Sequence, residues 1–197
     1  MAVHHRRPAP LTCHPATPAA AITAVRAAGW PAGDDCLAFR FELEGDLQRL
    51  RLPDAGTGSR RDGLWEHTCC EAFVACGTAG YVEFNFAPDG DWAAYRFSAY
   101  RERGHPDPAM PPPAIAARRE PGRFVLEAKV NIAGIEELEV AAGTCLGLAV
   151  VVEENGAARS YWALGHESDR PDFHAPGTFL HTLAAGTGTS PGKELAL

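Results

Sequence analysis

The sequence lacks any long apolar run. A helix that spans a membrane needs about 20 consecutive, mainly apolar residues, and the alanine-rich stretch at 19–22 is soon interrupted by Thr23 and Arg26. The first fifteen residues, MAVHHRRPAPLTCHP, also lack the apolar segment of roughly seven or more residues that marks a secretory signal. We therefore expect a soluble protein of the cytoplasm that does not bind membranes.

Clustered positive charge is also missing. The chain carries a net charge of −7 and has a pI near 5.6, and its arginines occur in separated pairs such as Arg60 with Arg61 and Arg118 with Arg119. Proteins that bind nucleic acids present a basic stripe or face to the phosphate backbone. The composition therefore predicts no nucleic-acid partner.

Cysteine is present without the spacing of a metal or redox motif. The sequence has six cysteines but no Cys-x-x-Cys, and outside a secretory context these thiols are expected to stay reduced. Cys69 and Cys70 fall in a predicted strand, where successive side chains point to opposite faces of the sheet. The two are therefore poor joint ligands for one metal ion.

Short β-forming segments dominate the chain, and helical signal is weak. Turn residues separate the segments, and the loop 101–113 holds five prolines, which cannot donate to a strand ladder. Propensity alone favours a helix near 19–28 and a single turn near 135–140. The expected strands are 37–43, 71–75, 81–86, 91–97, 123–130, 145–152, 160–164 and 179–183.

This pattern, in 197 residues of which 46% are apolar, favours a single domain. We expect an all-β, antiparallel β-sandwich with immunoglobulin-like or jelly-roll-like layers, and a barrel is the alternative. Residues 1–9 and 184–197 are expected to be flexible tails around a domain at 10–183, because these ends have no apolar periodicity. An exposed sheet edge leaves a homodimer open.

One predicted hairpin brings polar and aromatic groups together. If Ala87 to Gly90 form a four-residue turn, Phe86 pairs with Asp91. One face of the hairpin then resembles a core, whereas the other mixes aromatic, acidic, amide and guanidinium groups, as in a saccharide site or a solvated sheet face. This second face consists of Tyr81, Glu83, Asn85, Trp92, Ala94 and Arg96.

Catalytic motifs are not supported. Residues 188–192 match Gly-x-Ser-x-Gly, but Pro191 lacks the N–H that a nucleophile elbow uses for its oxyanion hole. His166 and Glu167 begin like a zinc-protease motif, yet Arg170 replaces the second histidine. We predict no catalytic residues, no metal ligands and no cofactor.

Two histidine-containing groups allow a structural or a functional interpretation. His67 and Glu71 would share a strand face, either as an acid–base pair or, more often, as groups that satisfy each other. The loop at 166–174 holds a second group that could gather around a metal ion, namely His166, Asp169, Asp172 and His174. Bonds to backbone groups of an irregular loop are the stronger interpretation.

The tryptophans suggest a different kind of site. Each of the four stands beside polar or turn residues, and a flat indole next to hydroxyl, amide and carboxylate groups suits the apolar face and polar rim of a sugar ring. For any single one, the stronger interpretation is a core residue with its N–H satisfied. They are Trp30, Trp65, Trp92 and Trp162.

Four blocks occur in this order: LWEHTCCEAF at 64–73, YVEFNFAPDGDWAAYRF at 81–97, SYWALGH at 160–166 and PDFH at 171–174. Together they resemble the DOMON-like domains related to type 9 carbohydrate-binding modules, over about residues 10–183. The resemblance implies an antiparallel sandwich that binds a ligand, sugar or haem, without catalysing a reaction. It also implies that Trp65 and Trp162 sandwich a sugar, with Glu83, Asn85 and Trp92 nearby.

A saccharide or another small polar ligand is therefore the expected partner. Haem is disfavoured because this group uses methionine and histidine as axial ligands, and the chain has only Met1 and Met110. A bis-histidine haem or metal site, and a protein-interaction domain without a small ligand, stay as alternatives. The predicted ligand-binding residues are Trp65, His67, Glu71, Glu83, Asn85, Trp92, Arg96, Trp162, His166, Asp172 and His174.

Overall fold

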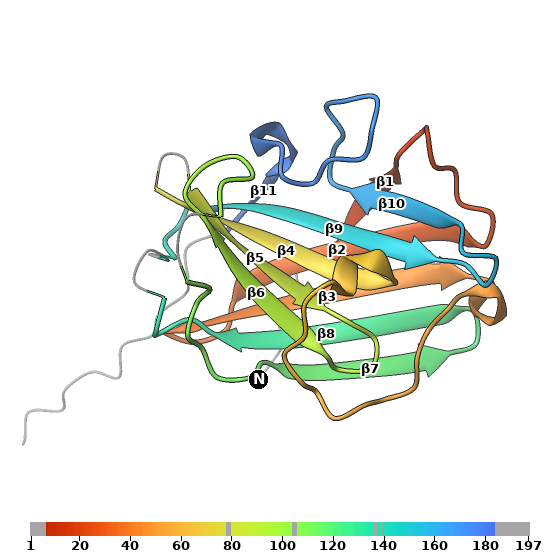
Figure 1. Cartoon of the computed structure of the whole chain (residues 1–197), viewed down its shortest axis with the longest axis horizontal. Helices are drawn as coiled ribbons and strands as arrows, with labels where there is room; N and C mark the ends of the chain where they lie inside the picture. The colour runs from red at the N-terminus through yellow and green to blue at the C-terminus, as the bar shows by residue number, and fades with distance from the viewer. Residues whose placement is uncertain (1–6, 78–79, 104–105, 136–137, 139, 184–197) are drawn as a thin grey trace, which may run out of the picture.

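Antiparallel β-strands make up nearly all of the regular structure (Figure 1). The computed structural model describes residues 7–77, 80–103, 106–135, 138 and 140–183. Within these ranges, three short 3-10 helices lie at Leu47–Arg49 (η1), Leu64–Glu66 (η2) and Pro176–Thr178 (η3). The strands are β1 (Ala9–Cys13), β2 (Ile22–Pro31), β3 (Cys36–Gly45), β4 (Cys69–Cys76), β5 (Gly80–Phe86), β6 (Trp92–Phe97), β7 (Ala114–Glu120), β8 (Arg123–Asn131), β9 (Cys145–Glu153), β10 (Arg159–Ala163) and β11 (His181–Thr182).

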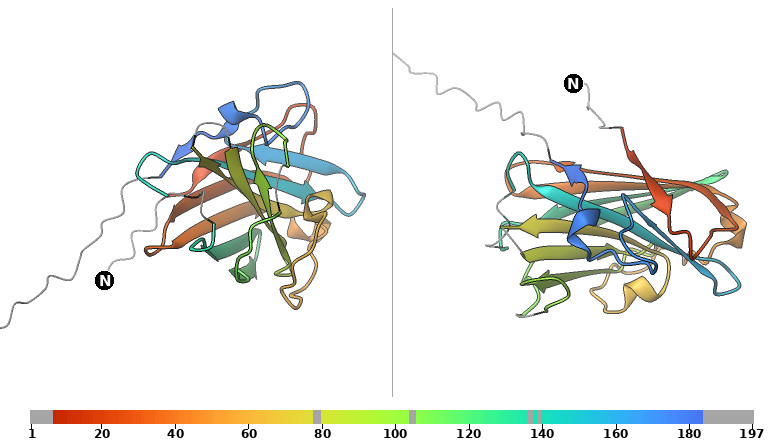
Figure 2. Two further views of the ribbon diagram at one scale, coloured as in Figure 1. Left: turned by 60° about the vertical axis from the view of Figure 1, so that its left-hand side comes forward. Right: turned by 90° about the horizontal axis from the view of Figure 1, so that it is seen from above.

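One curved sheet makes both layers of the sandwich. Its strand order is β6-β5-β4-β9-β10-β1-β2-β3-β8-β7, with β11 also paired to β9. Strand β1 joins the layers because it pairs with β10 through Thr12 and Ala163 and with β2 through Leu11 and Val25. Figures 1 and 2 show the layer β6-β5-β4-β9-β10 packed against the layer β2-β3-β8-β7 with inclined strand directions. The predicted single-domain sandwich is confirmed.

The segment predicted as a helix near 19–28 is instead largely strand β2. Its pairing with β3 explains the difference, because Ala27 lies opposite Phe41 and Val25 opposite Leu43, so that small side chains accommodate large ones. This tertiary pairing outweighs the helix propensity of alanine. Of the single turn expected near 135–140, residues 136, 137 and 139 lie outside the described part of the chain.

The predicted tails fall mainly outside the described residues, which begin at position 7 and end at 183. Ala9, assigned to the first tail, is already part of β1, where it lies opposite Ala27 of β2. The Gly-x-Ser-x-Gly match at 188–192 also lies outside the described residues.

The main core lies between the two layers. Phe39 of β3 packs against Phe86 of β5 with ring centroids 5.8 Å apart, and alternate residues of β8 and β9 complete the interior. Gly29 allows the layers to approach closely, since a Cβ at this position would lie 2.7 Å from Leu146 Cδ1. Complementary packing of this kind specifies the stacking of the layers.

The β5–β6 hairpin differs from the predicted one at its turn. Phe86 pairs with Trp92 instead of Asp91, and the Ala87 N–H donates to the Asp91 carbonyl across a three-residue turn that ends on Gly90 at φ 91°. The predicted face is wrong in consequence: Trp92 and Arg96 lie on the side of Phe86, opposite to Glu83 and Asn85.

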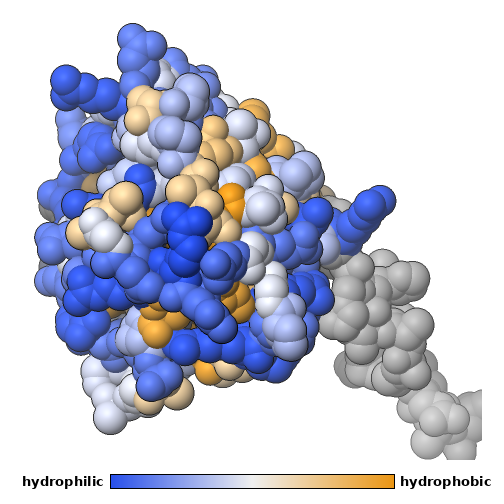
Figure 3. All heavy atoms as spheres, turned by 90° about the vertical axis from the view of Figure 1, so that its right-hand side faces the viewer, coloured by the Kyte–Doolittle hydropathy of each residue, from blue (hydrophilic) through white to orange (hydrophobic). Residues whose placement is uncertain are grey.

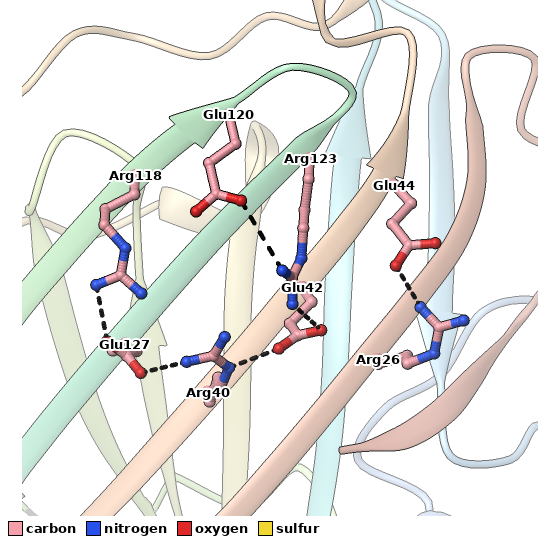
Figure 4. Close-up of polar contacts among 8 residues, drawn as sticks. All are labelled: Arg26, Arg40, Glu42, Glu44, Arg118, Glu120, Arg123 and Glu127. Atoms are coloured by element: carbon pink, nitrogen blue, oxygen red, sulfur yellow. Dashed lines mark hydrogen bonds and ion pairs between the residues drawn. The ribbon is translucent and has the colours of Figure 1, made fainter. Parts of the chain in front are cut away.

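The outer face of the β2-β3-β8-β7 layer carries a ladder of ion pairs (Figure 4). At its centre, buried Glu42 accepts a hydrogen bond from Arg40 at 2.6 Å and pairs with Arg123 at 2.8 Å. Burial acts to raise the pKa of Glu42, but the bonds from these arginines outweigh it and hold that pKa below its usual value. The paired charges let this face meet water without an apolar cover.

The two ends of the strand ladder differ. Residues 59–61 pair with the first residue of β6, where the Trp92 N–H donates to the Ser59 carbonyl and the Arg61 N–H to the Trp92 carbonyl. Strand β7 is exposed along most of its length, so a homodimer, which stays a prediction, would use that edge. At the right-hand end of the view in Figure 1, hydrophilic residues predominate and apolar ones form separate small patches (Figure 3).

The described residues include no helix of the length and apolarity that crossing a bilayer requires.

The ion-pair ladder predicts that replacing Glu42 lowers the free energy of unfolding more than replacing Glu44, which lies two residues further along β3. Glu42→Gln should lower the free energy of unfolding by about 2 kcal/mol, because two charge-assisted hydrogen bonds to a buried carboxylate are weakened. Glu44→Gln serves as the control, since Glu44 pairs with Arg26 at the surface and such pairs contribute about 1 kcal/mol or less. Urea unfolding measures both, and equal losses would contradict the central role of Glu42.

Candidate functional site

A cavity of about 400 Å³ opens on the outer face of the β6-β5-β4-β9-β10 layer. Odd-numbered residues of β4 and β5 point to this face, because their even-numbered neighbours fill the core between the layers. Trp65 of η2, Arg101 and Arg103 after β6, and Phe173 after β10 come from connecting segments and form the walls and the rim. Rigid strands thus supply the floor and loops supply the surround, as is common in binding sites.

Two buried carboxyl groups form the polar floor. Glu71 of β4 and Glu83 of β5 are 3% and 4% exposed, and Asn85 lies directly opposite Glu71 in the neighbouring strand. The Asn85 amide donates to Glu83 Oε1 at 2.6 Å, while its own oxygen accepts a bond from the Cys69 thiol at 3.4 Å. Among the described residues, Glu71 Oε1 has no hydrogen-bond partner although it is buried.

Both floor carboxyls are poor acids. Burial, reinforced by the neighbouring Glu83, raises the pKa of Glu71 well above its usual range. Burial likewise raises the pKa of Glu83 to about 7, against the opposing effects of the Asn85 amide and of Arg103 and Arg101. The floor therefore binds protons more readily than a surface carboxylate and carries a partial negative charge near neutral pH.

His174 forms one side of the floor through a hydrogen-bonded chain. The Arg101 backbone N–H donates to the Tyr81 hydroxyl oxygen at 3.1 Å, and this hydroxyl lies 2.8 Å from His174 Nδ1. The hydroxyl and the ring nitrogen can each donate or accept in this bond, and a hydroxyl that donates to Nδ1 leaves the imidazole proton on Nε2. Nε2 lies 3.8 Å from Glu83 Oε2. Burial and the nearby Arg101 lower the pKa of His174 to about 4, so the ring is neutral at pH 7.

Aromatic side chains line the walls. Trp65 is 40% exposed, which makes it the most exposed of the four tryptophans, and its ring meets Tyr95 edge to face at 5.6 Å. The Arg103 guanidinium lies 4.4 Å above the Tyr95 ring, which is a cation–π contact. Tyr161 and Phe173 form a second aromatic pair at 6.0 Å in the lining of the same cavity.

Three arginines surround the opening, and each is already bonded. Arg101 donates to Asp172 at 2.8 Å, and Asp172 also accepts a bond from the Tyr100 hydroxyl at 2.6 Å. Arg103 forms two bonds of 2.9 Å to Asp107. The third arginine of the lining, Arg159, donates to the Glu66 carbonyl at 3.1 Å.

Trp162 does not line this cavity, and the predicted sandwich of a ligand between Trp65 and Trp162 does not form. Trp162 is 7% exposed in the core between the layers, and its indole N–H donates to the Ser160 hydroxyl at 3.0 Å. Strand alternation places its neighbour Tyr161 at the cavity instead.

The eleven predicted ligand-binding residues, Trp162 included, divide between the cavity and the rest of the molecule. Four of them line the cavity, namely Trp65, Glu71, Glu83 and His174. Asn85 and Asp172 bond residues of the lining. The five that lie outside the cavity are His67, Trp92, Arg96, Trp162 and His166.

The two histidines among these five have partners elsewhere. His67 bonds Glu153 at 2.7 Å instead of pairing with Glu71, and it lines a separate hollow of about 540 Å³. His166 Nε2 lies 2.9 Å from the Thr12 carbonyl, and its ring packs edge to face on His14. Both side chains therefore support the surrounding structure, which was the stronger interpretation for His166.

Several lining residues were missed by the sequence analysis. The correct turn would have placed Tyr95 and Phe97 beside Glu83, and strand alternation would have favoured Tyr161 once Trp162 was assigned to the core. No local pattern marks the loop residues. The missed residues are Tyr95, Phe97, Arg101, Arg103, Val151, Arg159, Tyr161, Pro171 and Phe173.

Within the described ranges, no group of three or more histidine, cysteine, aspartate or glutamate side chains is arranged to hold a metal ion.

The fold is similar to solved structures of carbohydrate-binding proteins. One is a protein from Bacteroides uniformis to which carbohydrate binding has been ascribed, with a TM-score of 0.61, 18% identity, and coverage of 90% of this chain and 85% of that one. Another is a family 9 carbohydrate-binding module from Caldicellulosiruptor kristjanssonii in complex with cellotriose, with a TM-score of 0.52, 12% identity and 95% and 87% coverage.

A structure of a family 9 module from the same organism with glucose gives a TM-score of 0.50 at 10% identity, covering 94% of this chain and 87% of that one. No protein-family model matches the sequence, and no curated protein sequence does so. At these identities the likeness establishes a shared fold.

The opposite placement of the two tryptophans predicts unequal effects on stability. Trp162→Ala should lower the free energy of unfolding by about 3–5 kcal/mol, because it opens a cavity in the core. Trp65→Ala should cost about 1 kcal/mol or less, since the side chain is partly exposed at the cavity wall. Chemical denaturation of the two variants tests this, and a larger loss for Trp65→Ala would refute the assignment of the faces.

Because the two floor carboxyls are buried, we predict that removing the charge of one of them stabilises the unliganded protein. Because the folded state raises the pKa of Glu71, its contribution to stability is fully present below the ordinary value of 4.5 and is lost as the pH rises above it. For Glu83 the loss extends through about pH 7. Glu71→Gln should therefore raise the free energy of unfolding at pH 8 by about 1 kcal/mol or more, and by less at pH 4.5.

Unfolding curves at the two pH values provide the measurement. Glu44→Gln is the matched control, since Glu44 pairs with Arg26 on the other layer, outside the cavity. A Glu71→Gln protein that is less stable than the parent at pH 8 would show that the buried carboxylate is compensated in the unliganded protein.

Proposed function

We propose that this protein is a non-catalytic carbohydrate-binding domain that holds one sugar unit in the cavity on the β6-β5-β4-β9-β10 layer. The observation that carries the proposal is the juxtaposition of aromatic rings with a buried floor of Glu71, Glu83 and Asn85. The volume of about 400 Å³ lies within the usual range of small-molecule sites.

The chemistry of the walls and floor matches the two sides of a pyranose ring. The C–H groups of a sugar form an apolar surface that packs on an indole or phenol ring such as Trp65 or Tyr161. Its hydroxyls need acceptors and donors, which the Glu71 carboxyl and the His174 Nε2–H can supply. The unpartnered Glu71 Oε1 gains most, because a bound hydroxyl would give it a hydrogen-bond donor.

The similar solved structures support the proposal through their ligands. Two of them hold cellotriose or glucose, and they share the fold over most of this chain. The DOMON-like resemblance stays a prediction at the level of family, and it is consistent with a ligand-binding sandwich.

The arrangement of the carboxyls argues for binding without hydrolysis. Glycosidases place two carboxyl groups on either side of the bond that they cleave. Here Glu71 and Glu83 come from adjacent strands of one sheet face, so both would lie on the same side of a sugar.

Isothermal titration of the protein with a panel of mono- and disaccharides tests the proposal. We expect saturable binding of at least one sugar, and a loss of about tenfold or more in affinity for Trp65→Ala, because a stacked indole is a typical main contributor to a binding site. Trp30→Ala is the control: Trp30 lines a different, smaller hollow with residues of β3, β7 and β8, so its removal should leave the affinity unchanged.

Two results would contradict the proposal. Unchanged sugar affinity in Trp65→Ala would place the site elsewhere on the molecule. A folded protein that binds no member of the panel would favour the protein-interaction alternative.

A further inference from the structure

The cavity floor contains more acidic groups than a neutral sugar requires. Glu71 and Glu83 lie on adjacent strands of the same face, and burial together with the charge of Glu83 raises the pKa of Glu71. His174, which stands beside them, is neutral at pH 7. Among the described residues, Glu71 Oε1 has no hydrogen-bond partner at all.

The arginines at the rim do not resolve this excess. Arg101 and Arg103 act to lower the pKa of Glu83 through their charge, but their guanidinium groups bond Asp172 and Asp107. Asp107 is shared with Arg60, which donates to it at 2.9 Å, and Arg159 donates to the Glu66 backbone carbonyl. In the described part of the chain, none of the three lining arginines therefore donates a hydrogen bond to Glu71 or Glu83, which form the floor of the same cavity.

We infer that the bound saccharide carries a primary amine, and that its ammonium group lies between Glu71 Oε1 and the Glu83 carboxylate. This inference rests on the proposed function and names the class of sugar that the site prefers. An ammonium has three N–H donors and a positive charge, so it can satisfy the unpartnered Glu71 oxygen and Glu83 together and relieve their repulsion. A neutral hydroxyl has one O–H donor and leaves the repulsion in place.

The geometry of Glu83 is compatible with this role. Its Oε1 is occupied by the short bond from Asn85, which fixes the carboxyl group in one orientation. Its Oε2 lies 3.8 Å from His174 Nε2, which is longer than a hydrogen bond. Both glutamates line the cavity, and Glu71 Oε1 has no hydrogen-bond partner among the described residues.

Matched pairs of sugars that differ only in the amine test the inference. The affinities of glucosamine and glucose, galactosamine and galactose, and mannosamine and mannose are measured by isothermal titration at about pH 7. For at least one pair we expect the amino sugar to bind about tenfold or more tightly, as a buried charge-assisted hydrogen bond implies.

Two isosteric variants locate the preference. Glu71→Gln and Glu83→Gln remove a charge with little change of shape, and each should bring the amine-to-neutral affinity ratio towards one. Glu44→Gln, on the outer face of the other layer, removes an equal charge outside the cavity and should leave the ratio as it is. A thermal unfolding curve for each variant verifies that it is folded.

The outcomes separate the two claims. Equal or tighter binding of the neutral sugars overturns the amine preference and leaves the proposed function standing. An amine preference that survives in both floor variants overturns its assignment to Glu71 and Glu83. Absence of binding by all six sugars to the folded protein overturns the inference, and with it a site for simple monosaccharides.

Discussion

The side chains of a β-strand alternate between the two faces of its sheet, and in β4, β5 and β6 this alternation separates the core from the cavity. Phe84 and Phe86 enter the interior between the layers, while Glu83 points outward to the floor of the cavity together with its partner Asn85. The same alternation holds across the ladder, since Glu71 of β4 lies opposite Asn85 of β5. The polar floor of the proposed site therefore depends on the register of these strands, and a slip of one residue would exchange the floor for the core.

The loops complete the site by burying what the strands present. Segments from η2, from the region after β6 and from the region after β10 surround the face, so that carboxyl groups on the outside of a sheet become nearly inaccessible to water. Burial raises the pKa of both glutamates, which is a cost in stability that the proposed binding role would explain. In the opposite layer the buried carboxylate of Glu42 is compensated differently, because it forms ion pairs with two arginines.

Much of the fold could be predicted from the sequence, since the segments that form β3, β5, β8, β9 and β10 combine β-forming residues with clear turns at their ends. Strand β2 could not, because its alanines favour a helix locally and only their pairing with the large residues of β3 makes them strand. The site was harder to predict. Both faces of β10 carry aromatic residues that are covered, one by the core and one by loops, so the pattern alone could not show that Tyr161 and not Trp162 faces the cavity. For Trp92 and Tyr95, the length of the β5–β6 turn determines which of the two faces the cavity and which faces the core.

The central claim is that the ligand binds beside Trp65, on the outer face of one layer. Nuclear magnetic resonance of the indole N–H groups tests this most directly, because the four tryptophans give separate signals that single Trp→Phe variants assign. On titration with a sugar that binds, the account predicts a large shift of the Trp65 signal and much smaller shifts for Trp30, Trp92 and Trp162. A signal of Trp162 or Trp30 that moves most, while that of Trp65 stays in place, would contradict it.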